Sequence, residues 1–265
     1  MNSLTNDWVG GGENSFASTS IVVLGANYAK DKNTWENKLD LAYGIIKTQD
    51  TPMRKNEDKI DFLSKYGRKV TDKLSASALV NFRSQFDAGY KYPNDSVVVS
   101  RFMAPGYLMA SLGFDYKPVE YLSIFLSPAT GKFTFVLDDD LAAIGAYGVD
   151  PGKNVNPEFG ALASIAFAKE VFENVRLASK VDLFNNYTDK DKSNRKNTDV
   201  NWETTLNMKV NRFITASMGF NLIYDHDIPI SIYETIAGEQ VQVGTGPRTQ
   251  FKQLFGIGLS YNFKK

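Results

Sequence analysis

The 265-residue chain has no cysteine, no surplus of either charge and no long apolar run. The absence of cysteine excludes thiol chemistry and Cys-ligated metals. Lysine plus arginine and aspartate plus glutamate number 30 each, so the composition gives neither a basic surplus for nucleic acid nor an acidic tail. No run approaches the ~18 apolar residues of a membrane helix. Residues 1–4 lack the basic start and apolar core of a signal peptide, so we expect the numbering to begin on a mature or trimmed chain.

Residues 35–46 show an alternation of apolar and charged side chains. Odd positions from Trp35 to Ile45 are nearly all apolar, whereas Glu36, Lys38 and Asp40 are charged. Alternate side chains of a strand point to opposite faces, so this segment has an apolar face and an ionic face. Aromatic residues reach 13% of the chain, which is typical of alternating strands flanked by aromatic girdles.

The same alternation recurs along the chain and predicts eleven clear strands. They cover residues 16–29, 35–46, 59–70, 74–86, 108–116, a strand that begins at 122, and residues 159–168, 175–187, 200–210, 214–224 and 251–263. Pro128 and Gly131 disturb the strand after 122, which predicts a β-bulge there. Connections alternate between short ones, at 31–33, 71–73, 117–120, 169–174 and 211–212, and long ones.

A soluble β-sandwich explains the polar faces but gives no reason for alternating loop lengths. A transmembrane β-barrel explains both, with short periplasmic turns and long extracellular loops. Aromatic residues near strand ends, such as Trp35, Tyr116 and Trp202, fit interfacial girdles. Bacterial barrels usually have an even number of strands, and residues 2–8 supply a further outward strand. We therefore predict one all-β domain over residues 1–265: an antiparallel up-and-down transmembrane β-barrel of about 12 strands in the outer membrane.

Four sequence blocks resemble a known family. Trp8-Val9-Gly10-Gly11-Gly12-Glu13-Asn14-Ser15 resembles the W-x-x-G-G-E-N-S signature of a Bacteroidetes outer-membrane barrel family that is catalogued as a domain of unknown function. Residues 65–69, 92–96 and 127–133 are similar to its other common blocks. The resemblance implies a barrel in the outer membrane of a Gram-negative bacterium, and it implies no activity.

The alternation also assigns residues to faces of the barrel wall. The predicted lumen-lining residues are charged and of mixed sign: Glu36, Lys38, Asp40, Lys59, Asp61, Lys65, Arg83, Asp115, Arg176, Lys180, Asp182, Glu203, Lys209 and Lys252. The predicted lipid-facing residues are apolar: Leu39, Leu41, Tyr43, Val80, Phe82, Leu206, Phe220, Leu222, Ile257 and Leu259.

Two interpretations of the ionic lumen follow. The charges either line a narrow aqueous path or pair across the barrel and fill it. Mixed signs favour pairing, because a selective pore usually has an excess of one sign. The favoured function is thus a structural or accessory subunit of an outer-membrane assembly, which contacts lipid and other outer-membrane proteins and binds no nucleic acid. The alternative is a narrow, porin-like channel for small polar solutes.

An outer-membrane enzyme is the weakest hypothesis. The single histidine, His226, lies in a long loop without an identifiable nucleophile partner, although Ser231 is near in sequence. Asp138, Asp139 and Asp140 lack the spacing of a calcium loop. The glycines at 10–12 are not followed by a phosphate-loop GK[ST]. We predict no catalytic residue, no metal site and no cofactor.

Overall fold

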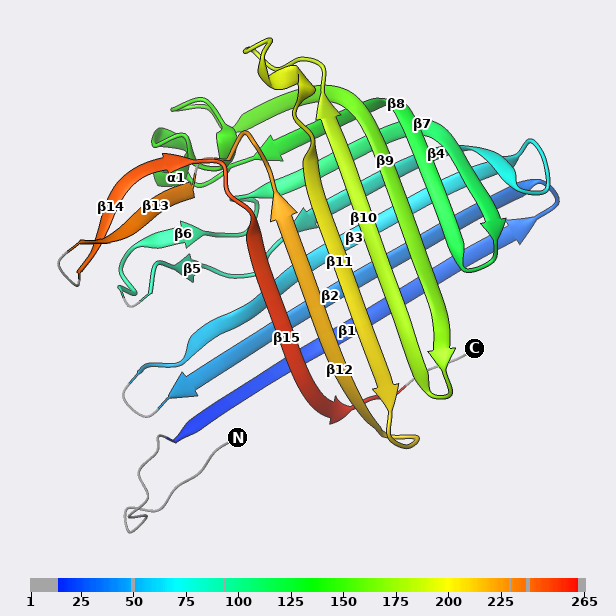
Figure 1. The fold of residues 1–265 in the computed structure, drawn as a ribbon, viewed down its shortest axis with the longest axis horizontal. Helices are drawn as coiled ribbons and strands as arrows, with labels where there is room; N and C mark the ends of the chain where they lie inside the picture. The colour runs from blue at the N-terminus through cyan, green and yellow to red at the C-terminus, as the bar shows by residue number, and fades with distance from the viewer. Residues whose placement is uncertain (1–13, 49–50, 93, 229, 237–238, 262–265) are drawn as a thin grey trace.

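The computed structural model describes residues 14–48, 51–92, 94–228, 230–236 and 239–261. The fold is one curved antiparallel sheet of eleven strands, ordered β1-β2-β3-β4-β7-β8-β9-β10-β11-β12-β15 (Figure 1). These strands are β1 (Ser15–Lys30), β2 (Asn33–Thr48), β3 (Arg54–Lys69), β4 (Leu74–Ser84), β7 (Gly106–Val119), β8 (Leu122–Phe135), β9 (Val155–Phe172), β10 (Val175–Asn186), β11 (Asp199–Lys209), β12 (Ile214–Tyr224) and β15 (Gln250–Leu259).

Smaller elements occupy the long connections. They are the hairpin strands β5 (Gly89–Tyr90) and β6 (Val98–Ser100), helix α1 (Asp139–Ala143), the 3-10 turns η1 (Ala146–Gly148) and η2 (Asn194–Lys196), and the hairpin strands β13 (Ile230–Ile236) and β14 (Glu239–Gly246). No helix in the described part of the chain is long and apolar enough to span a membrane.

Each strand of the main sheet pairs with its neighbour in the chain once the small hairpins are set aside. This up-and-down order confirms the all-β antiparallel prediction, with eleven strands described and about 12 predicted. Short turns lie at one end of the strands and long loops at the other (Figure 1). The predicted strand at residues 2–8 lies outside the described residues.

A bulge interrupts the pairing of β8 with both neighbours, as Pro128 predicts. The register shifts between Ser127 and Thr130 against β9 and between Leu112 and Phe114 against β7. Hydroxyl groups stabilise the bulge: Ser127 donates to the Leu112 carbonyl at 2.8 Å, and Thr130 donates to Ser111 at 2.9 Å. The bulge is therefore held by specific hydrogen bonds. Beyond it the side chains of β8 again alternate between the concave and convex faces.

Two rows of register partners show how the convex face is built. One row joins Leu24, Leu39, Phe62, Phe82, Leu108 and Phe133 on six adjacent strands. The other joins Leu74, Tyr116, Ile124, Ile165, Val181, Trp202, Leu222 and Phe251 on eight. Apolar side chains thus form continuous bands across the outside of the wall.

β1 and β15 are the two ends of the sheet. Ten successive antiparallel pairings make these two strands run in the same direction. Antiparallel closure of the wall therefore requires an odd number of further strands between them, at least one.

Candidate functional site

The concave face of the sheet is where polar side chains become buried. The buried polar side chains are Ser77, Asn81, Ser84, Ser111, Asp115, Ser127, Thr130, Lys132, Thr134, Glu158 and Ser164, and almost all take inward positions on β4 and β7–β9. Large apolar side chains on the opposite face of these strands are exposed, including Leu112 at 64% and Leu126 at 54%. This arrangement differs from that in a soluble protein, whose buried positions are mainly apolar, because here as many polar as apolar side chains are buried.

An ion cluster occupies the concave face near the short turns. Lys65 on β3 pairs with Asp115 on β7 at 2.9 Å and with Glu36 on β2 at 3.6 Å. Lys117 donates to Glu36 and lies 3.7 Å from Asp115. Ser123 on β8 donates to Asp115. Two cations and two carboxylates from three strands, β2, β3 and β7, therefore neutralise one another.

A second cluster lies nearer the long loops and is centred on Lys132 of β8. The Lys132 ammonium is 3.2 Å from Glu158, 2.8 Å from Asp199 and 3.2 Å from Asp225. Its side chain is only 9% exposed. Asn186 also donates to Glu158 at 3.0 Å. Because Asp199 begins β11 and Asp225 follows β12, Lys132 connects β8 to strands on the far side of the curved sheet.

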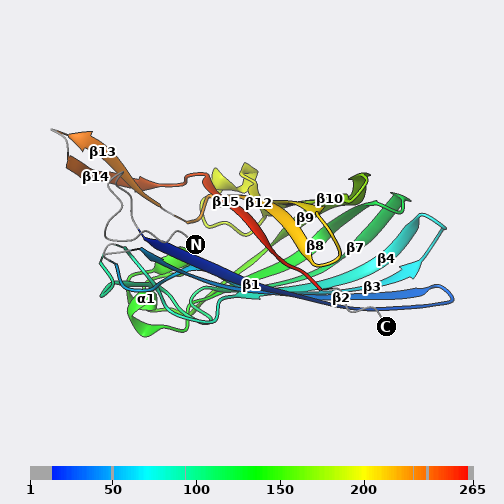
Figure 2. The same ribbon diagram turned by 90° about the horizontal axis from the view of Figure 1, so that it is seen from below.

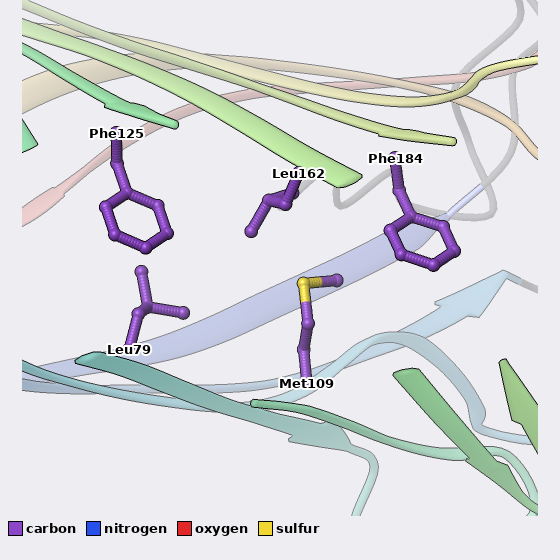
Figure 3. Packing of buried hydrophobic residues seen from close by; sticks show 5 residues of the cluster. All are labelled: Leu79, Met109, Phe125, Leu162 and Phe184. Atoms are coloured by element: carbon purple, nitrogen blue, oxygen red, sulfur yellow. The ribbon is translucent and has the colours of Figure 1, made fainter. Parts of the chain in front are cut away.

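An apolar layer separates the two clusters. It consists of the buried side chains of Leu79, Met109, Phe125, Leu162 and Phe184, from β4, β7, β8, β9 and β10, with Leu63 of β3 packed against them. Figure 3 shows Leu79 and Met109 pointing toward Phe125, Leu162 and Phe184 from opposite sides. Their exposed fractions of 2–8% indicate a filled layer. We name it the lumen layer.

Other ion pairs cross the concave side between strands that are distant in the sheet. Lys59 on β3 binds Glu203 on β11 at 3.1 Å and lies 3.6 Å from Asp61. Lys252 on β15 binds Glu57 on β3 at 2.7 Å. The strong curvature of the sheet, clearest in Figure 2, brings these side chains together.

Eleven of the fourteen predicted lumen charges occur in these pairs or in two pairs along single strands. Lys38 binds Asp40 at 2.6 Å, and Lys180 binds Asp182 at 2.8 Å. The remaining three are Arg83, Arg176 and Lys209. Arg83 lies 6.0 Å from the ring centre of Tyr107, and the other two are exposed at the short-turn end.

Sequence reasoning missed the centre of this arrangement. Lys132 and Glu158 were not assigned, because the bulge after Pro128 obscures the phase of β8 and β9 begins weakly patterned. The alternation of Lys132 and Thr134 with Phe133 and Phe135 could have indicated the inward set. The lumen layer was missed because each strand contributes only one inward apolar residue. Such a residue looks like an isolated exception to the alternation until the register of the five strands is known.

The ten predicted lipid-facing residues take the opposite, convex face. Leu39, Phe82 and Leu222 belong to the apolar rows described above. Ile257 is 69% exposed and Leu259 is 86% exposed. Each is offset by an odd number of positions from the inward residues of its strand, as strand geometry requires.

The long loop between β8 and β9 contacts three other long loops. The Tyr147 hydroxyl donates to the Val99 carbonyl, and burial raises the pKa of Tyr147 to about 12. Lys190 donates to Asp150 at 2.6 Å. A Cβ on Gly148 would lie 3.1 Å from the Asp227 carbonyl oxygen. Ala104, Val136, Leu141, Ala142 and Val149 form a small buried core beneath this loop.

The residues considered for catalysis and metal binding have structural contacts. Asp138 caps α1 by accepting from the Leu141 N–H at 3.1 Å and pairs with Arg101 at 3.3 Å. The His226 Nδ1 lies 3.2 Å from the Tyr224 hydroxyl, and the His226 N–H donates to Asp199 at 3.3 Å. Among the described residues, no group of three or more potential ligands is arranged to hold a metal ion.

Comparisons with known proteins give a family match and two structural likenesses. A family model described as "Protein of unknown function (DUF3078)" matches residues 1–90. The predicted resemblance to a domain of unknown function is thus confirmed over this part of the chain. No curated protein matches the sequence.

Two solved structures are similar to the chain at low identity. The NanC porin has 8% identity and a TM-score of 0.41, over 94% of this chain and 98% of the porin chain. An outer membrane channel from Pseudomonas putida F1 has 13% identity and a TM-score of 0.42, over 93% of this chain and 85% of the channel chain.

Proposed function

We propose that this chain is an outer-membrane β-barrel with a closed lumen, and that it is a structural or accessory subunit of an outer-membrane assembly. Exposed apolar side chains on the convex face and buried polar side chains on the concave face support the membrane location. Apolar bands cover the convex face, and contiguous exposed apolar surface of this kind marks contact with lipid or another protein. In the proposed orientation the long loops are extracellular and the short turns periplasmic. The Gram-negative, Bacteroidetes source implied by the sequence resemblance belongs to the same proposal.

The observation that carries the closed lumen is the lumen layer. A conducting barrel needs a continuous aqueous path, and small barrels leave one only where side chains do not fill the interior. Here Phe125, Leu162 and Phe184 contact Leu79 and Met109 across the interior. Paired charges lie on both sides of this layer. Charges that are neutralised by one another provide little attraction for a passing ion.

Planar-bilayer recording of the purified, folded protein tests the closed lumen. We expect no steady single-channel steps from the natural chain. The triple variant Phe125→Ala, Leu162→Ala, Phe184→Ala removes one side of the lumen layer and should conduct. The matched control, Leu112→Ala, Leu126→Ala, Ile165→Ala, shortens exposed outward side chains on β7, β8 and β9 and should remain silent. Steady steps from the natural chain would favour the narrow-channel alternative.

The subunit role has a separate test. Affinity purification in mild detergent should recover other outer-membrane proteins with the chain. Recovery of the bare monomer alone would contradict the subunit role and leave the closed lumen unaffected. We propose no enzymatic activity and no cofactor, because His226 and Asp138 are engaged in local hydrogen bonds.

A further inference from the structure

Exposed cations surround the short-turn end of the sheet. Pairs of them flank three of the hairpin turns: Lys30 and Lys32 at β1–β2, Lys69 and Lys73 at β3–β4, and Lys209 and Arg212 at β11–β12. We name these six residues the turn rim. All six are exposed, and within the described part of the chain none of their side chains forms an ion pair with a carboxylate.

Carboxylates at the same end do not neutralise the cations. Arg68, Lys169 and Arg176 join the turn rim to give nine exposed cations, against five exposed carboxylates at Asp31, Asp72, Glu120, Glu170 and Glu173. Glu170 is engaged by the Asn174 N–H at 2.9 Å. Counted over the exposed side chains of the described residues, the short-turn end therefore has an excess of four positive charges, although the whole chain has a net charge of zero.

Several cations at the long-loop end form ion pairs with carboxylates. Lys55 binds Asp58 at 2.7 Å, Arg101 binds Asp138 at 3.3 Å, and Lys190 binds Asp150 at 2.6 Å. Lys47, Lys192, Lys196 and Arg248 at this end are also exposed and form no ion pair with a described carboxylate. What distinguishes the short-turn end is that its cations stand in pairs beside three of the hairpin turns.

Aromatic side chains lie between the turn rim and the apolar wall. Tyr28, Trp35 and Tyr66 are register partners on β1, β2 and β3, and each is about half exposed. The Lys169 ammonium lies 4.3 Å from the ring centre of Tyr121. Tyr and Trp favour the headgroup level of a bilayer, so cations just beyond them reach the lipid phosphates.

We propose that the turn rim binds the headgroups of anionic phospholipids in the leaflet that the short turns face. This inference rests on the proposed membrane location. Lysine attracts phosphate as a point charge and arginine through paired N–H groups. Cations placed on three separate turns can contact several lipids around the barrel at once, and clusters of this kind recognise anionic membrane surfaces.

Native mass spectrometry of the folded protein in detergent measures lipid retention. The probes are phosphatidylglycerol and phosphatidylcholine with identical acyl chains. We expect several-fold more phosphatidylglycerol than phosphatidylcholine on the natural chain. Substituting glutamine for all six residues of the turn rim should lower phosphatidylglycerol retention by roughly tenfold, and the preference should weaken at high salt because exposed charges are screened.

The control variant Lys153→Gln, Lys190→Gln removes two exposed lysines at the long-loop end and should retain the preference. Equal retention by the turn-rim variant and the natural chain would overturn the proposal, as would an equal loss in the control. Insertion into vesicles, scored by resistance to alkaline extraction, separates the two proposals. Insertion without a phosphatidylglycerol preference refutes the turn rim alone, whereas failure to insert refutes both.

Discussion

The central strands β4 and β7–β10 and the edge strands β1 and β15 belong to one sheet but differ in burial. On β8 the inward residues Phe125 and Thr130 are 2% and 0% exposed. On β1 the inward residues Ile21 and Val23, opposite Ala42 and Asp40, are 59% and 57% exposed.

Both regions consist of long, regular antiparallel strands, so strand propensity does not account for the difference. Packing across the concave side does: Leu79, Met109 and Phe125 have partners facing them, whereas Ile21 and Val23 remain exposed. The proposed closure of the lumen therefore rests on the central strands. The same-direction edges β1 and β15 are the region where the wall requires a further strand.

The largest expected effect tests the central ion cluster. Lys132→Met leaves the buried Glu158 and the partly buried Asp199 and Asp225 without their cation and should lower the free energy of unfolding by about 3–5 kcal/mol. Lys38→Met, near the edge of the sheet, removes a lysine whose side chain is 55% exposed and should cost less than ~1 kcal/mol. Urea unfolding in vesicles, followed by tryptophan fluorescence, measures both. Equal losses would break the comparison.

Backbone proximity gives a second contrast of this kind. A Cβ on Gly160 would lie 1.9 Å from the Asn185 carbonyl oxygen, where β9 meets β10. Gly160→Ala should therefore lower the free energy of unfolding by about 1–3 kcal/mol. A Cβ on Gly256 of β15 meets no atom within 4 Å, so Gly256→Ala should change the free energy of unfolding by less than ~0.5 kcal/mol. The same urea assay checks the pair, and a larger loss at Gly256 would contradict the expected order.

Amide hydrogen exchange sharpens the comparison at the edges. Backbone amides of β8 and β9 are paired on both sides and should exchange only through opening that approaches global unfolding. The outer edges of β1 and β15 have no partner strand among the described residues, so their amides should exchange faster, by local opening, unless the further strand that closure requires pairs with them. Slow exchange along both edges would indicate pairing with a strand outside the described residues.

The smallest expected effect concerns Asp227, in the long connection that follows β12. Burial, with Asp199 and Asp225 nearby, raises the pKa of Asp227 above its ordinary 3.8. The folded protein thus holds the proton of the Asp227 carboxyl more tightly than the unfolded chain does. The contribution of Asp227 to the free energy of unfolding therefore falls as pH rises through the raised pKa. Asp227→Asn should raise the free energy of unfolding at neutral pH by up to ~0.5 kcal/mol and change it little near about pH 4.

Asp191 provides a control of opposite sign. Hydrogen bonds from the Ser193 N–H and hydroxyl lower the pKa of Asp191. Asp191→Asn should therefore reduce stability at neutral pH, where the natural carboxylate is ionised in both the folded and unfolded chain. Urea midpoints at the two pH values measure both variants, and an equal sign for both would contradict this assignment.

The regular features of the fold were predictable from the sequence. Alternation in segments such as Trp35–Ile46 located all eleven strands of the main sheet, and loop lengths separated the two ends of the strands. Pro128 indicated the bulge in β8. These features are local, because neighbouring residues determine the two faces of a strand and the length of a turn.

Two kinds of feature could not be predicted from neighbouring residues in the sequence. The phase of β8 after Pro128 depends on how Ser127 and Thr130 bond to β7, so the positions before Pro128 do not give the orientation of Lys132. Pairing partners such as Lys59 and Glu203 are 144 residues apart, and the sequence gives their charges without their distance.

The sequence by itself determined the strand pattern, the apolar and ionic faces and the alternation of short and long connections. Only the tertiary structure decided which charges neutralise one another and that an apolar layer lies between them. The physical reason is that the curvature of the sheet places side chains of distant strands in contact. Burial around Lys132 and packing of Phe125 against Leu79 exist only once that curvature has formed.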